Sequence, residues 1–171
     1  MASASSLTAR QTSNTNEAIN KIVSDLDIAM HKVGPKILTL QAQQKFSDAT
    51  IGEQMRILGT AFFKADVSLA RTPVSSGSTT VRPTNEDISV IYGEVMQLFS
   101  SHLSGVIPTG AVPHFSDMVK ILDPIVANAT LQLNITSPGS LIFVKRVMVD
   151  ARQFLASEGF NSTSAALGYP I

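Results

Sequence analysis

The stretch "PTNEDISVIYGEVMQLFSSHL", residues 83–103, carries the clearest helical pattern in the chain. Its large apolar residues recur at the spacing i, i+3, i+4, i+7, which places them on one face of an α-helix. Thr84 and Asp87 have the spacing of a helix-start signature, so we expect Thr84 to cap this helix. A tyrosine hydroxyl lies on this face, which fits either a plain protein core or a core that encloses a guest molecule. The face comprises Ile88, Ile91, Tyr92, Val95, Leu98, Phe99 and Leu103.

The segments before this stretch show the same periodicity. A first helix is expected to begin at Asn14 and to end at Gly34-Pro35, because proline disfavours a continuous helix. A second helix is expected to follow Thr50, whose distance from Glu53 along the chain is that of a capping box. Two long amphipathic helices therefore precede the central one.

Helix-breaking residues divide the rest of the chain. Residues 73–83 are small and polar and predict a mobile loop, and the Gly- and Pro-containing segment 105–113 predicts a lid over apolar residues. We expect further helices over residues 116–133, with a kink at Pro124, and over residues 141–157. No alternating strand pattern competes with these helices. The sequence predicts an all-α fold, an antiparallel bundle of about five helices.

Length and composition indicate one domain with a net charge of zero. A chain of 171 residues suits a single core, which we place at residues 14–158 between a disordered lead, 1–13, and a loose tail, 159–171. The 13 Lys+Arg balance the 13 Asp+Glu, so no positive surface is available for nucleic acid or anionic membranes. The longest dense apolar patch, "LIFV", is far below the roughly 20 residues of a membrane-spanning helix. We therefore expect no integral membrane segment and no nucleic-acid partner.

Other sequence features favour a secretory route. Three sequons, at Asn128, Asn134 and Asn161, are glycosylation acceptors in a eukaryotic secretory pathway. The start of the chain lacks the apolar middle of a signal peptide, so we expect that the signal has already been removed. Cysteine is absent, which excludes disulfides, thiol nucleophiles and thiolate metal sites.

The motifs of common catalytic sites are missing from the chain. It contains no glycine-rich phosphate loop, no Gly-x-Ser-x-Gly elbow and no histidine pair at metal-ligand spacing. His31, His102 and His114 lie in different segments, and Asp25 and Asp27 are assigned to a solvated helix face. We therefore expect a protein that is not an enzyme and has neither a metal nor a cofactor.

Uncharged polar residues recur among the apolar ones, as at Gln54, Tyr92, His102 and Thr130. A buried hydroxyl or amide without a partner costs about 1–3 kcal/mol. Two interpretations remain open: each group bonds a nearby backbone carbonyl in a plain core, or together they line a tunnel for a hydrocarbon guest with one oxygen-bearing end. Methionines suit such a tunnel because thioethers adapt to irregular apolar shapes. The predicted lining residues are Met30, Gln54, Met55, Leu58, Phe62, Tyr92, Val95, Phe99, His102, Leu122, Val126, Met148, Ala151 and Phe154.

The order of these segments resembles a known family. An initial "INKIVSDLDIAMHKV" helix, a long second helix ending "ADVSLART", a loop of small residues and then "PTNEDISVIYGEVMQLFSSHLSGVI" are similar to the fungal cell-wall galactomannoproteins and hydrophobic-surface-binding proteins. The likeness covers about residues 14–158, and its best-matching part is the Thr84 cap followed by the apolar face from Ile88 to Phe99.

The resemblance implies a secreted or cell-wall protein without catalytic activity. Some members of the family are five-helix domains that enclose a long-chain fatty acid, such as arachidonate or palmitate, and sequester it. Others adsorb to hydrophobic surfaces and recruit hydrolases. We expect a lipid-binding monomer or weak homodimer with an internal apolar tunnel, and the surface-adsorbing adaptor is the alternative.

The position of the ligand's carboxylate is left open by the sequence. None of the predicted apolar faces carries a central Lys or Arg, and a buried carboxylate without a partner costs several kcal/mol. We therefore expect the head group near a tunnel mouth, held by the neutral donors Tyr92, Gln54 or His102, or reached by Lys145 or Arg152.

Overall fold

The computed structural model describes residues 13–170, and these residues form seven α-helices, one 3-10 turn and no β-strand. The all-α prediction is confirmed, whereas more helices form than the five expected. The expected lead, residues 1–13, lies outside the described part except for Ser13. The elements are α1 (Asn16–Ala42), α2 (Asp48–Arg71), α3 (Asn85–Leu103), η1 (Ile107–Thr109), α4 (Phe115–Thr136), α5 (Ser140–Val147), α6 (Arg152–Glu158) and α7 (Asn161–Ala166).

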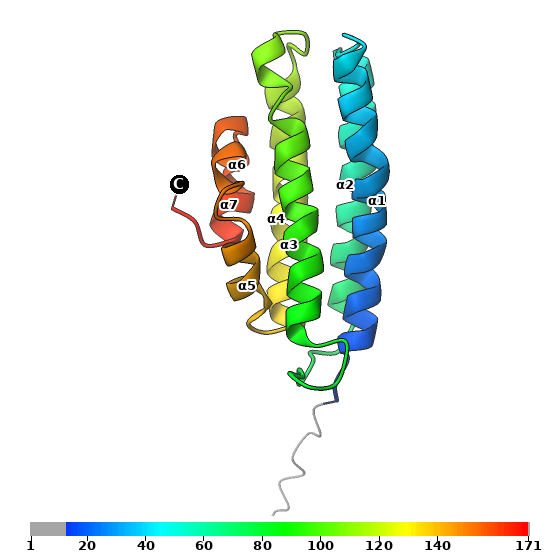
Figure 1. Ribbon diagram of the computed structural model, residues 1–171, viewed down its shortest axis with the longest axis vertical. Helices are drawn as coiled ribbons and strands as arrows, with labels where there is room; N and C mark the ends of the chain where they lie inside the picture. The colour runs from blue at the N-terminus through cyan, green and yellow to red at the C-terminus, as the bar shows by residue number, and fades with distance from the viewer. Residues whose placement is uncertain (1–12, 171) are drawn as a thin grey trace, which may run out of the picture.

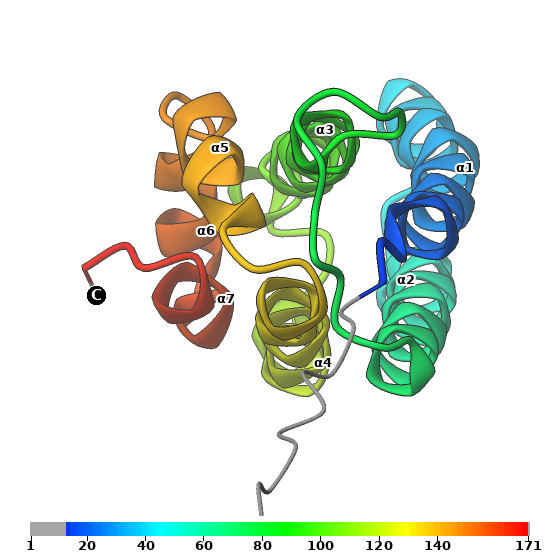
Figure 2. The ribbon, with the colours of Figure 1, turned by 90° about the horizontal axis from the view of Figure 1, so that it is seen from below.

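The helices pack in three layers. Helices α1 and α2 form one layer, α3 and α4 the next, and the short helices α5, α6 and α7 cover the far side of α3 and α4 (Figure 2). Consecutive long helices run in opposite directions (Figure 1). Because α1 packs on α3 and α2 packs on α4, these two packed pairs run parallel.

Helix α1 continues through the position where the sequence predicted its end. Pro35 lies inside the helix, and the buried residues Ile37 and Leu40 extend the apolar face beyond it. Burial of these side chains offsets the hydrogen bond that a proline inside a helix cannot donate, a loss of about 3 kcal/mol. The Thr39 hydroxyl also donates to the Pro35 carbonyl at 2.7 Å. The predicted end at Gly34-Pro35 is therefore wrong, since tertiary packing outweighs the local signal.

Capping boxes begin α2 and α3. The predicted cap of α3 is confirmed: the Asp87 N–H donates to the Thr84 hydroxyl at 3.1 Å, and the Thr84 N–H donates to the Asp87 carboxylate at 2.8 Å. The box of α2 lies three residues earlier than predicted, because Ser47 is the cap and Thr50 is its partner. Glu53 instead pairs with an arginine one turn later.

The loop between α2 and α3, predicted to be mobile, crosses the end of the bundle and is tied to α1 (Figure 2). The Ser75 hydroxyl is buried and donates to Asn16 Oδ1 at 2.7 Å. The Asn16 side chain donates in turn to the Pro83 carbonyl at 3.0 Å and to Asn85 Oδ1 at 2.9 Å. These contacts join the start of α1, the loop and the start of α3.

The C-terminal segment differs from the prediction in two ways. The single helix expected over residues 141–157 is divided into α5 and α6 by turns at residues 148–151. The expected loose tail contains α7, which packs on α4. Asp123 of α4 holds its start, because the Asp123 carboxylate accepts hydrogen bonds from the backbone N–H groups of Ser162 and Thr163, both at 2.8 Å.

Helix α4 spans Pro124 and extends beyond both predicted ends, residues 116 and 133. The segment before it, predicted as a lid, buries Val106 and Val112 and forms the 3-10 turn η1. None of the helices in residues 13–170 combines the length and the apolar character needed to cross a membrane.

Candidate functional site

An apolar groove of about 470 Å³ lies between α2 and α4. This volume falls in the range of about 300–1,000 Å³ that is typical of small-molecule sites. The groove is partly open to solvent, and its exposed residues include Phe63 and Ile121, whereas Met55 and Leu122 at its floor are buried. The lining residues are Gly52, Met55, Arg56, Gly59, Thr60 and Phe63 of α2 and Met118, Ile121, Leu122 and Ile125 of α4.

Two glycines of α2 lie along the groove. Gly52 and Gly59 are seven residues apart, which places them on the same face of α2 two turns from each other. A Cβ atom at Gly59 would lie 3.6 Å from Leu122 Cδ1, and one at Gly52 would lie 3.4 Å from Met118 Cε. The α4 side chains therefore pack directly against the α2 backbone at these two positions.

The rim of the groove is also apolar. Phe63 of α2 is 59% exposed and Ile121 of α4 is 69% exposed. Arg56 is the one charged residue among the described lining residues, and its guanidinium binds the Glu53 carboxylate through two hydrogen bonds, at 3.0 and 2.8 Å. The groove thus offers hydrocarbon contact along its length and a positive group at one place.

Most of the predicted site residues belong to the core, and two of these core residues also border the groove. Met55 and Leu122 line the groove. Phe62 and Phe99 meet edge to face with ring centroids 5.5 Å apart, and Phe99 meets Phe160 in the same way at 4.9 Å, so aromatic rings occupy this part of the interior. The other apolar residues buried in the core are Met30, Leu58, Val95, Val126, Met148 and Ala151, while Phe154 is partly buried against it.

Two of the three neutral residues predicted to hold a head group, Tyr92 and His102, have partners within the protein. The Thr130 hydroxyl donates to the Val126 carbonyl at 2.8 Å, so the Tyr92 hydroxyl, 2.8 Å away, donates to Thr130. Burial raises the pKa of Tyr92 above its ordinary value. Nδ1 of His102 lies 2.6 Å from the Leu98 carbonyl, and Gln54 is buried in α2.

The predicted cationic alternatives lie in another layer. Lys145 of α5 and Arg152 of α6 both approach the Tyr169 ring, at 5.8 and 5.7 Å from its centroid. Helix α4 separates this layer from α2 (Figure 2). The structure therefore brings Met55 and Leu122 together at the groove, but leaves Lys145 and Arg152 apart from it.

Glu158 is a buried acid without a hydrogen-bond partner. Its side chain is 4% exposed, and neither carboxylate oxygen accepts or donates a hydrogen bond within the described residues. Burial raises the pKa of Glu158 to about 9, so the side chain is protonated at neutral pH. A ligand in solvent does not reach this buried group. The buried acid instead affects how the stability of the fold depends on pH.

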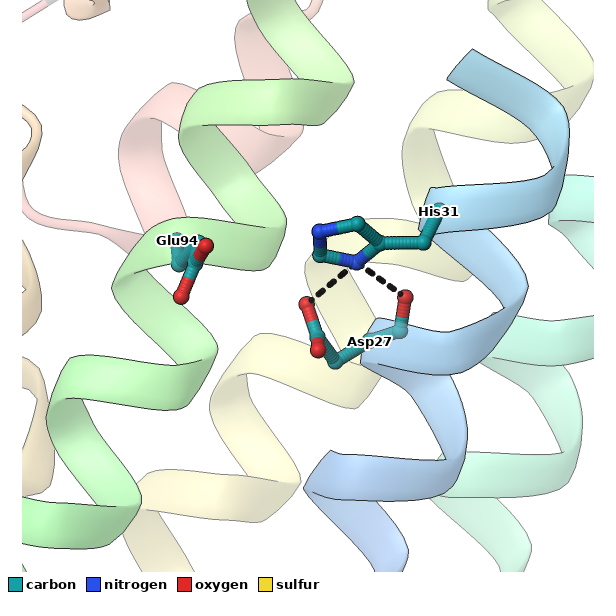
Figure 3. Close-up of side chains that lie close together, drawn as sticks. All are labelled: Asp27, His31 and Glu94. Atoms are coloured by element: carbon teal, nitrogen blue, oxygen red, sulfur yellow. Dashed lines mark hydrogen bonds and ion pairs between the residues drawn. The ribbon is translucent and has the colours of Figure 1, made fainter. Parts of the chain in front are cut away.

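A cluster of one imidazole and two carboxylates joins α1 and α3 on the surface. One side-chain ligand atom each of Asp27, His31 and Glu94 lies within 4.8 Å of the other two (Figure 3). From the sequence, Asp27 was expected on a solvated helix face and without a link to Glu94. The spacing i, i+4 of Asp27 and His31 was the available signal, whereas Glu94 is brought close only by packing of α3 on α1.

The three sequon asparagines, Asn128 and Asn134 on α4 and Asn161 at the start of α7, are all exposed. Glycosylation at these positions stays a prediction that their exposure permits.

Comparison with known proteins assigns no family to the chain. No protein-family model matches it, and no curated protein matches its sequence.

Proposed function

We propose that this protein is a secreted or cell-wall protein that binds and sequesters a long-chain fatty acid, with the acyl chain in the groove between α2 and α4. The observation that carries the proposal is the apolar groove itself, with Gly52 and Gly59 along it and the exposed Phe63 and Ile121 at its rim. The resemblance in helix order to the fungal galactomannoprotein family supports the same ligand class.

The groove is a better position for the acyl chain than the tunnel inferred from the sequence. A tunnel through the centre requires the rings of Phe62, Phe99 and Phe160 to separate, which gives up their edge-to-face contacts. The groove requires no such rearrangement. An interior tunnel is the alternative placement. It would bury more of the acyl chain than the groove does, and would therefore bind it more tightly.

The expected affinity follows from how much of the chain is buried. Full enclosure of about 15 methylenes at roughly 0.8 kcal/mol each contributes on the order of 12 kcal/mol before the costs of immobilisation. A groove that covers roughly half of this surface contributes about 6 kcal/mol, which corresponds to a Kd of tens of micromolar at best. Submicromolar binding would thus favour the tunnel, and weaker binding favours the groove.

Arg56 is the group that we assign to the fatty-acid carboxylate. Its pair with Glu53 is solvent-exposed, with 67% and 51% of the two side chains accessible. Exposed pairs of this kind contribute about 0–1 kcal/mol, so a ligand carboxylate can displace Glu53 at little cost. Arg56 takes the place of the predicted donors Tyr92 and His102, because the Tyr92 hydroxyl and His102 Nδ1 already have partners within the protein.

Displacement of a fluorescent fatty acid by palmitate tests the proposal. Ile121→Asp places a charge on the exposed rim of the groove, and we expect at least about a tenfold loss of affinity because a carboxylate there must be desolvated by the acyl chain. Ile142→Asp is the matched control, because Ile142 is 59% exposed on α5 and does not line the groove. Equal binding by both variants, or no saturable displacement in the unmodified protein, would refute the groove site.

The second candidate function is adsorption to hydrophobic surfaces, which the exposure of Phe63 and Ile121 favours. Adsorption to alkyl-coated beads that soluble palmitate does not compete, and that Ile121→Asp reduces more than Ile142→Asp, would favour this adaptor role. Competition by palmitate would instead indicate that beads and fatty acid use the same groove.

A further inference from the structure

The cluster of Asp27, His31 and Glu94 is separate from the groove, because it connects α1 with α3 whereas the groove lies between α2 and α4. Figure 3 shows His31 extending from α1 toward α3, with Glu94 on the neighbouring turn of α3. We propose that these three side chains form a binding site for a divalent transition-metal ion of the zinc class.

The orientation of the His31 ring supports this assignment. Nδ1 lies 3.0 Å from the Asp27 carbonyl oxygen and donates its proton to it. With the proton on Nδ1, the lone pair of Nε2 is free, and Figure 3 shows this nitrogen on the side of the ring that faces α3. A backbone carbonyl that fixes one ring nitrogen so that the other is available is the usual arrangement around metal-binding histidines.

Neither of the two carboxylates has a lysine or an arginine as a partner in the described part of the chain. Asp27 Oδ1 is buried and accepts no hydrogen bond, although His31 Nδ1 lies 3.2 Å from it. When the imidazole is neutral, two negative charges therefore face each other across α1 and α3, and a cation between them removes the repulsion.

The donor set selects the class of ion. One imidazole and two carboxylates are a combination that zinc and its neighbours accept, whereas calcium requires six to eight oxygen ligands. Ligands bound to one tetrahedral zinc lie about 3.4 Å apart, given metal–ligand bonds of about 2.1 Å. The present separations, up to 4.8 Å, close by rotation of the exposed Glu94 side chain toward the fixed imidazole, with water as the fourth ligand.

Titration of the metal-free protein with Zn²⁺ at constant pH tests the site. We expect saturable binding of about one ion per chain, a rise in the thermal unfolding temperature because the ion links α1 to α3, and a shift of one of the three histidine resonances. His31→Ala and Glu94→Gln each remove one ligand and should weaken binding at least about tenfold, since even outer-shell changes cost that much. Ca²⁺ and Mg²⁺ should not produce these effects.

His114→Ala is the matched control. His114 Nδ1 lies 2.7 Å from Asp48 Oδ2, so this pair has the same chemistry as His31 with Asp27, and it is not part of the three-residue cluster. Zinc affinity should be unchanged in this variant. Absence of saturable zinc binding, binding that persists in His31→Ala or Glu94→Gln, or an equal loss in His114→Ala would each overturn the proposal.

Discussion

The two parallel helix pairs of the bundle, α1 with α3 and α2 with α4, differ in how tightly the facing helix packs against a glycine. At Gly34 on α1, the imidazole of His102 fills the space, and a Cβ atom there would lie only 2.7 Å from its Cε1. At Gly59 on α2, the nearest atom of α4 would lie 3.6 Å from a Cβ, and an open groove remains. Both glycines lack a side chain, and the difference lies in the facing helix. A side chain of α3 fills the space beside Gly34, whereas the side chains of α4 leave a groove beside Gly59.

The pairs also differ in how their histidines are held. In α1–α3, the hydrogen bond to the Asp27 carbonyl and the nearby Asp27 carboxylate raise the pKa of His31. At the start of α2 and α4, the hydrogen bond between His114 and Asp48 raises the pKa of His114 and lowers the pKa of Asp48. Both histidines therefore contribute stability below their ordinary pKa, and that contribution is lost as the pH rises through the folded-state pKa.

The largest expected effect on the pH dependence of stability comes from Glu158, which belongs to neither helix pair. Its titration masks the smaller contributions of His31 and His114. The pKa of Glu158 is about 9 when folded against an ordinary value of 4.5, so between these values the folded state holds a proton that the unfolded state has lost. Stability should therefore fall by up to about 1.4 kcal/mol per pH unit as the pH rises, and the loss is complete above the folded-state pKa.

Glu158→Gln should flatten this decline, because glutamine does not titrate. Urea unfolding of both proteins between about pH 5 and pH 9 measures it. An equal slope in both proteins would show that another group causes the decline. In the Glu158→Gln background, the smaller contributions of His31 and His114 can be compared directly.

Gly34→Ala should destabilise the protein by about 1–3 kcal/mol, because the added methyl group overpacks the contact with His102. The double variant Gly34→Ala/His102→Ala provides space for the methyl group, so the two changes should be strongly non-additive. Chemical unfolding of the three variants and the unmodified protein completes the cycle. Additive effects would show that the ring moves aside freely and that the α1–α3 contact is looser than we infer.

Gly59→Ala should have the smallest effect on stability and the opposite sign. A Cβ at this position makes an ordinary contact at 3.6 Å, and alanine is favoured over glycine inside a helix by roughly 0.5–1 kcal/mol. The same methyl group narrows the groove, so fatty-acid affinity should fall while the melting temperature rises. A protein that is both more stable and unimpaired in binding would place the ligand elsewhere.

The predictions that the structure confirms rest on residues close together in the sequence. The apolar face from Ile88 to Phe99 and the Thr84 cap predicted α3, and the structure confirms both. The signals that misled were also local. Pro35 suggested a helix end, yet the apolar face of α1 continues past it against the rest of the core.

The residues of the candidate sites were harder to predict from the sequence than the helices. Met55 and Leu122 were selected by their apolar spacing, and the structure places both at the groove. Gly52 and Gly59 were not selected, although their separation by seven residues marks one helix face. Phe62 and Phe99 have the same apolar spacing, but they are completely buried with their rings in edge-to-face contact and do not border the groove.

Periodicity and capping, which act within a few turns of one helix, account for the all-α fold, the amphipathic faces and the central helix α3 in this chain. The pairing of helices depends instead on contacts between residues far apart in sequence. Glu94 reaches His31 because α3 packs on α1, and Asp123 orders α7 because α4 presents a carboxylate to its first N–H groups. Such contacts arise from the summed burial of whole helix faces, and no local pattern encodes which faces meet.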